Sequence, residues 1–101
     1  MNVIFVEQAK FEFLDAIAYY KSAHARLGER FKDEADRSIL WISDHPELFR
    51  IRPGGYRRIN LRVFPYYIPY ITRGSDLWIL AVAHGYRKPE YWIERKDTIQ
   101  G

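Results

Sequence analysis

The sequence predicts a single α+β domain spanning residues 1–101, with two N-terminal helices packed on one face of a small, mostly antiparallel sheet. Three observations predict it. Apolar residues recur at three- and four-residue spacings between residues 8 and 42, as in amphipathic helices. The spacing changes to two from Tyr56, and residues 77–83 (LWILAVA) are continuously apolar, as in a covered strand. The expected order is strand-helix-helix-strand-strand-strand, followed by a short C-terminal helix.

The N-terminal half is expected to form a short strand over residues 3–6 and then a pair of helices. The first helix should run over residues 8–27 and stop at Gly28, because glycine is favoured just after a helix end. The second should begin at residue 29 or 30 and end before Pro46, since the residue preceding a proline avoids helical angles. Its acidic residues are expected to form a solvated face without a catalytic role: Asp33, Glu34 and Asp36.

The C-terminal half should contribute a three-stranded meander over residues 56–63, 66–72 and 77–83. The last of these should be the central strand, because both of its faces are apolar. Pro69 stands inside the middle one, and a bulge is expected there because proline has no N–H for the ladder. Pro89 suits the first turn of a short helix over residues 90–95, and the last five or six residues are expected to fray.

The chain is weakly basic, and its positive charge belongs to the second half. Residues 1–47 hold six Lys/Arg and nine Asp/Glu, a net charge of −3, whereas residues 48–101 hold ten Lys/Arg and four Asp/Glu, a net charge of +6. An anionic partner should therefore be drawn to the second half. The absence of cysteine excludes disulfides and thiolate zinc sites and fits a reducing cytoplasm. We recognise no signal peptide, no membrane-spanning run and no phosphate-binding glycine loop.

Candidate functional residues lie on the meander and just after it. Arg58 and Arg62 should project from one face of a strand, where guanidinium groups can hold phosphates or carboxylates; a merely solvated face is the alternative. Arg57 should point towards the helices. His84 ends the apolar run close to Arg87, and an imidazole can donate or accept a proton near neutral pH. The alternative for His84 is a structural hydrogen bond at a strand end. Both the sheet face away from the helices and the loop after the central strand are expected to be left for function.

Motifs along nearly the whole chain resemble one family of bacterial proteins. They are Tyr19-Tyr20, Leu27-Gly28 with Phe31, Pro46, Tyr56-Arg57-Arg58, Phe64-Pro65-Tyr66 with Ile68 and Tyr70, residues 79–85 (ILAVAHG), Arg87-Lys88-Pro89 and Tyr91-Trp92. In this order they are similar to the RelE/ParE superfamily of toxins from type II toxin–antitoxin systems.

The resemblance implies two helices on a small antiparallel sheet, and a cognate antitoxin whose acidic or amphipathic tail wraps the basic surface. It also implies one of two activities. RelE-like members cut mRNA in the ribosomal A site without a metal ion or other cofactor. ParE-like members poison DNA gyrase and are not known as nucleases.

For a RelE-like activity, the resemblance assigns roles to five residues. Arg58 and Arg62 would bind the scissile phosphate, His84 with Arg87 would move protons, and Tyr91 would stack on a base or donate a proton. For a ParE-like activity, the toxin would bind its target without chemistry of its own. A third possibility is a harmless relative that binds only its antitoxin.

Overall fold

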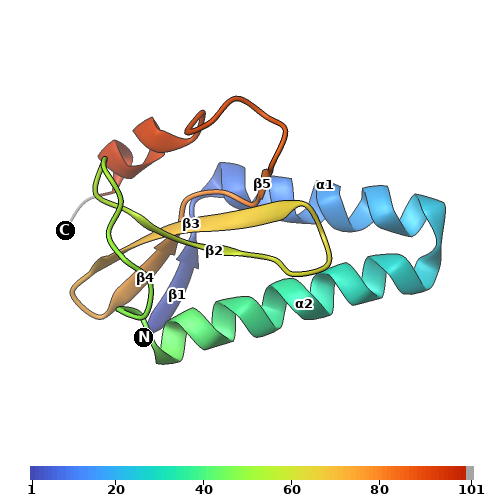
Figure 1. The fold of residues 1–101 in the computed structure, drawn as a ribbon, viewed down its shortest axis with the longest axis horizontal. Helices are drawn as coiled ribbons and strands as arrows, with labels where there is room; N and C mark the ends of the chain where they lie inside the picture. The colour runs from blue at the N-terminus through green and yellow to red at the C-terminus, as the bar shows by residue number, and fades with distance from the viewer. Residues whose placement is uncertain (100–101) are drawn as a thin grey trace.

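The computed structural model describes residues 1–99 and has the predicted α+β architecture (Figure 1). A first strand leads into two long helices, four further strands and a 3₁₀ helix. In chain order these are β1 (Asn2–Phe5), α1 (Glu7–Ala23), α2 (Ala25–Asp44), β2 (Arg57–Asn60), β3 (Tyr66–Arg73), β4 (Asp76–Ile79), β5 (Ala83–His84) and η1 (Ile93–Thr98). Neither helix in this part of the chain is long and apolar enough to cross a membrane.

The sheet has the order β1-β4-β3-β2, with β5 paired to the start of β3. Among the strand pairs within residues 1–99, only β1–β4 is parallel; the others are antiparallel. β4 lies between β1 and β3, which confirms the central position expected for the run at residues 77–83. That run is not one strand, however, because it leaves the ladder after Ile79 and returns only at Ala83.

The interruption lies opposite Pro69, where a bulge was expected. Tyr70 pairs with Ile79 and Tyr67 pairs with Ala83, so two residues of β3 face the three residues 80–82. The carbonyl of Pro69 accepts a hydrogen bond from the Leu80 N–H at 2.9 Å. The Pro69 nitrogen carries no proton and so cannot donate a hydrogen bond to the neighbouring strand. The ladder therefore stops here, and backbone groups of residues 80–82 must find partners elsewhere.

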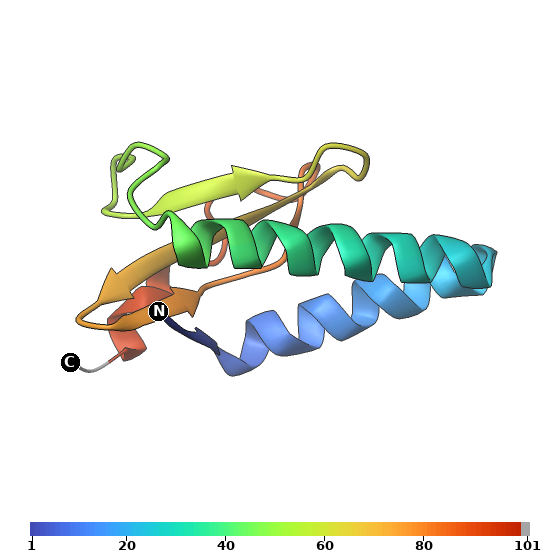
Figure 2. The same ribbon diagram turned by 90° about the horizontal axis from the view of Figure 1, so that it is seen from below.

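The two helices form a hairpin on one side of the sheet and extend past its end (Figure 2). The prediction that the first helix stops at Gly28 was wrong. The break comes at His24, whose backbone is extended and whose Nδ1 accepts a hydrogen bond from the Arg26 N–H at 3.1 Å. Gly28 lies inside α2, where an added Cβ would come within 2.9 Å of the Lys21 Cβ. Its small size lets the two helices approach closely.

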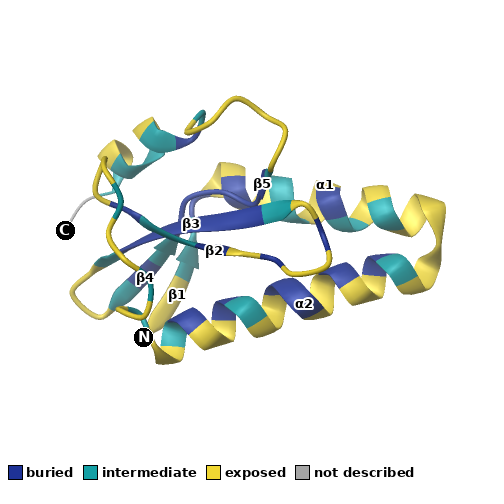
Figure 3. Cartoon of the chain, viewed as in Figure 1, coloured by how far each residue is buried: buried dark blue, intermediate teal, exposed yellow. Residues whose placement is uncertain are grey.

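The C-terminal segment covers part of the other face of the sheet, which was expected to be open. Tyr66 contacts Tyr20 of α1 and Phe31 of α2, so Tyr67, the next residue in the strand, points away from the helices. Trp92 is fully buried there and donates from Nε1 to the Tyr67 hydroxyl at 2.9 Å. The dark blue residues of Figure 3 show the resulting burial of both β3 faces.

The C-terminal helix also begins later than predicted. Glu90 has a φ of 58°, a left-handed conformation that stops a helix from starting at this residue. The chain turns through residues 89–92, and η1 follows from Ile93 to Thr98. Residues 96–98 of the end expected to fray are therefore helical, while residues 100–101 of that expectation lie outside the described residues.

Candidate functional site

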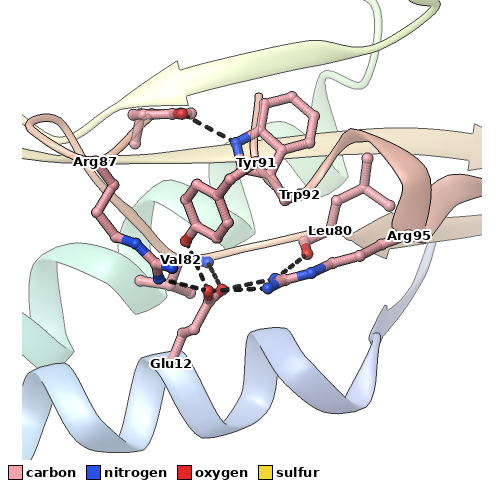
Figure 4. A network of polar contacts seen from close by, with 8 residues as sticks. Glu12, Leu80, Val82, Arg87, Tyr91, Trp92 and Arg95 are labelled. Carbon is pink, nitrogen blue, oxygen red and sulfur yellow. Dashed lines mark hydrogen bonds and ion pairs between the residues drawn. The ribbon is translucent and has the colours of Figure 1, made fainter. Parts of the chain in front are cut away.

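Glu12 of α1 is the centre of a polar network that joins α1 to the C-terminal segment (Figure 4). Its carboxylate accepts hydrogen bonds from the Tyr91 hydroxyl at 2.6 Å and from the Val82 N–H at 3.1 Å. Arg95 contacts both carboxylate oxygens, at 2.9 and 3.2 Å, and Arg87 approaches at 3.5 Å. We call these residues the Glu12 network.

The network has a structural cause in the break opposite Pro69. Residues 80–82 leave the ladder, and two of their backbone groups are bound by the network's charged pair. Glu12 accepts from the Val82 N–H, while Arg95 donates to the Leu80 carbonyl at 3.0 Å. Both charged side chains are mostly buried, 16% and 18% exposed, so each also needs the other as a counter-ion.

Two residues nominated for RNA chemistry, Arg87 and Tyr91, belong to this network. The guanidinium of Arg87 stacks over the Tyr91 ring at 3.7 Å. Burial, followed by the hydrogen bond to Glu12, raises the pKa of Tyr91 above its ordinary value. A phenol with a raised pKa is a weaker proton donor, and its proton is already directed at a carboxylate. The structure thus shows a packing role for both residues, and their roles towards RNA stay predictions.

His84 lines a cleft of about 270 Å³ between α1 and β5, which we call the α1 cleft. Arg87 is the other nominated residue that it contains. The cleft is lined by Glu12, Asp15, Ala16, Tyr19, Tyr66, Val82, His84 and Arg87. The His84 Nδ1 accepts a hydrogen bond from the Tyr86 N–H at 3.1 Å, so in the neutral ring the proton lies on Nε2.

Arg58 and Arg62 do not share a strand face, as had been expected. β2 ends at Asn60, and Arg62 lies in the connection to β3. Arg58 is on the face away from the helices, with its guanidinium 4.4 Å from the centre of the Tyr67 ring. Its neighbour Arg57 points towards the helix side, as predicted, and donates from Nε to the Phe49 carbonyl at 2.6 Å.

Arg62 instead lines a groove of about 850 Å³ between α2 and β2, which we call the α2 groove. Its other lining residues are Glu34, Arg37, Ser38, Trp41, Phe49, Ile59, Asn60 and Val63. The nominated arginines therefore lie in three places: on the outer sheet face, in the α2 groove and in the α1 cleft. These three arginines therefore do not form the one basic surface that the resemblance implied.

Glu34 is the second structural carboxylate that the sequence did not reveal. It was expected on a solvated face, but it is only 9% exposed. Its oxygens accept from the backbone N–H groups of Arg62 and, at 3.2 Å, of Val63. Glu34 therefore fixes the β2–β3 connection to α2.

Glu12, Glu34 and Arg95 could not be identified from their spacing, since each is a charged residue within an ordinary helical pattern. The one usable signal was Pro69, which predicts orphaned backbone groups somewhere beside β3. Among residues 1–99, no group of three His, Asp or Glu side chains is placed to bind a metal ion.

Comparison with known proteins identifies the family. Residues 3–89 match the family model described as the ParE toxin of type II toxin–antitoxin systems, parDE. A solved structure from the chromosomal ParDE TA system of P. aeruginosa is similar, with a TM-score of 0.55. The likeness covers 83% of this chain and 95% of that chain at 20% sequence identity, and so shows a common fold alone. No curated protein sequence matches the chain. Because the family model spans most of its length, the chain belongs to the ParE toxins of type II toxin–antitoxin systems, within the RelE/ParE superfamily.

Proposed function

We propose that this toxin arrests growth by binding DNA gyrase, without cleaving RNA. Its family implies a cognate antitoxin as a partner, and we propose that this antitoxin neutralises it. Gyrase acts on the chromosome, so the proposed site of action is the cytoplasm.

The observation that carries the proposal is the engagement of Arg87 and Tyr91 by Glu12. A ribonuclease of the RelE kind would need a cation free to attract phosphate and a group ready to give up a proton. Here Arg87 faces a carboxylate at 3.5 Å, and the Tyr91 hydroxyl donates to the same carboxylate at 2.6 Å. The dispersal of Arg58 and Arg62 further supports a binding function over a catalytic one.

A supercoiling assay with purified gyrase tests the proposal. Toxin freed from its antitoxin should inhibit the introduction of supercoils at micromolar concentration, and added antitoxin should restore them. In cells, induction without the antitoxin should give filaments and gyrase-dependent DNA breaks. Full supercoiling activity in the presence of folded, toxic protein would refute gyrase as the target.

Ribosome-dependent mRNA cleavage is the second candidate, and one observation favours it. His84 and Arg87 line the same cleft, and the hydrogen bond at Nδ1 leaves the Nε2 proton of His84 for donation. If this activity operates, His84→Ala should abolish toxicity and remove new ends in translated messages. An absence of growth arrest on induction without antitoxin would instead indicate a harmless relative.

A further inference from the structure

A series of aromatic rings runs from α1 across the start of β3 to the loop that follows β5. The Tyr66 and His84 ring centroids are 5.0 Å apart, and those of His84 and Tyr86 are 5.2 Å apart. On the other side, Tyr66 lies near Tyr20, which contacts Tyr19. The rings come from elements far apart in the sequence, and three of them, those of Tyr19, Tyr66 and His84, line the α1 cleft.

Tyr86 is the most exposed large side chain of this series. It is 91% exposed, and Tyr19 is 67% exposed. Covering a tyrosine ring lowers the free energy, so rings exposed to this degree favour contact with a partner. Tyrosine, tryptophan and arginine are enriched among the few residues that carry most of the binding energy at protein–protein interfaces. An exposed tyrosine beside a ring-lined cleft and Arg87 therefore has the composition of an interface centre.

The loop that carries Tyr86 is held in place by backbone hydrogen bonds. The Gly85 N–H donates to the Pro65 carbonyl at 2.8 Å, and the Arg87 N–H donates to the His84 carbonyl at 3.1 Å. The Tyr86 N–H donates to the His84 ring. A loop already fixed in this way loses little conformational entropy when a partner binds it.

The charges of the α1 cleft indicate the kind of partner. Two carboxylates line it, and that of Glu12 is paired with Arg95 and Arg87. Asp15 makes no ion pair within the part of the chain that the structure describes. An RNA phosphate would be repelled by Asp15, whereas a lysine or arginine side chain would find a carboxylate among aromatic rings.

We infer that the α1 cleft and Tyr86 form the surface by which the toxin binds its protein target, with a cationic side chain of that target in the cleft. This inference rests on the proposed function, in which the target is gyrase. The binding face of the toxin is then formed by α1, β5 and the following loop, and the α2 groove takes no part in binding the target.

Supercoiling assays on matched variants test the inference. Tyr86→Ala should raise the toxin concentration needed for half inhibition by at least about tenfold, as expected for an interface centre. Asp15→Asn should raise it by about threefold and reduce its dependence on salt, because one exposed charge pair is lost. Trp41→Ala is the control: it removes a 52% exposed ring from the α2 groove and should change the value less than about twofold.

The outcomes separate the inference from the proposed function. Suppose that the wild-type toxin inhibits gyrase. If Tyr86→Ala then inhibits equally well, or if Trp41→Ala loses inhibition instead, the inference is wrong but gyrase remains the target. No inhibition by the wild-type toxin would remove the target itself. If Tyr86→Ala abolished crosslinking of the toxin to ribosome-bound mRNA and left gyrase inhibition intact, the partner would be RNA, and the inference would be wrong. Thermal unfolding of each variant verifies that it is folded.

Discussion

Glu12 and Glu34 are both helix carboxylates that bind the backbone of a distant loop, yet they serve their regions differently. Glu34 of α2 accepts from two backbone N–H groups, those of Arg62 and Val63, and in the structure it has no cationic partner among residues 1–99. Glu12 of α1 accepts from a backbone N–H, a phenol and two guanidinium groups. Glu12 is thus neutralised by cationic partners within a network of side chains, whereas Glu34 binds only the backbone of one exposed loop.

This difference determines which of the candidate side chains are free to bind a target. Arg62 uses its backbone for structure, so its side chain remains exposed in the α2 groove. Arg87 and Tyr91 use their side chains for structure, and these are the groups that RNA chemistry would require. Substitutions at the two carboxylates should therefore differ in size and in reach.

The largest effect is expected for Glu12→Ala. It leaves the buried Arg95 without a counter-ion and the Val82 N–H without an acceptor, and should lower the free energy of unfolding by about 3 kcal/mol. Chemical denaturation measures this value. Asp15→Ala, an exposed carboxylate on the same helix, should cost less than about 0.5 kcal/mol. Equal losses for the two variants would show that the network is not structural.

The two arginines of the network should differ next. Arg95 is 18% exposed and binds both Glu12 and the Leu80 carbonyl, so Arg95→Ala should cost about 2 kcal/mol. Arg87 is 56% exposed and its contact with Glu12 is 3.5 Å long, so Arg87→Ala should cost about 0.5 kcal/mol. Denaturation curves for both variants provide the comparison, and a reversed order would mean that Arg87 is the main counter-ion.

Glu34→Ala should cost less than Glu12→Ala, about 1.5 kcal/mol, because the released N–H groups lie in an exposed connection that water can reach. The effect should also be local. Hydrogen exchange should quicken at the Arg62 and Val63 amides while the amides of β4 keep their protection. Asp33→Ala, on the exposed side of α2, is the control. Faster exchange throughout the sheet would indicate that Glu34 supports the whole core.

Tyr91→Phe should cost less than Glu34→Ala, about 1 kcal/mol at neutral pH, from loss of one hydrogen bond to a carboxylate. It should also change the alkaline stability profile. Burial and Glu12 raise the Tyr91 pKa above the ordinary value of 10.0, so the folded state holds this proton more tightly than the unfolded state. Its contribution is complete below pH 10.0 and is lost as pH rises further.

Stability measured across this range should therefore fall less steeply in Tyr91→Phe than in the wild-type toxin. Identical slopes would show that the phenol gains nothing from its surroundings in the fold.

The fold could be predicted because periodicity reports which side of an element is buried. The helical spacing and the alternation from Tyr56 identified the hairpin and the meander, and the apolar run at residues 77–83 identified an internal strand. The prediction at Gly28 failed because glycine is favoured both at helix ends and where two helices pack closely. It was interpreted as a helix stop, but here it is needed for close packing of α1 against α2.

The site could be predicted less well, because its polar contacts join residues far apart in the chain. Glu12 meets Arg95 across 83 positions, and Glu34 meets Arg62 across 28. Neither partner changes the local pattern around the glutamate. The alternation that placed Arg58 and Arg62 on one face failed because β2 ends at Asn60, two residues before Arg62.

Addition of the purified toxin to translating ribosomes, followed by mapping of mRNA ends, decides whether the toxin cleaves RNA. With Arg87 and Tyr91 bound by Glu12, we expect intact messages at toxin concentrations that block gyrase supercoiling. New ends within translated codons, present with the wild-type toxin and absent with Tyr91→Phe, would contradict it.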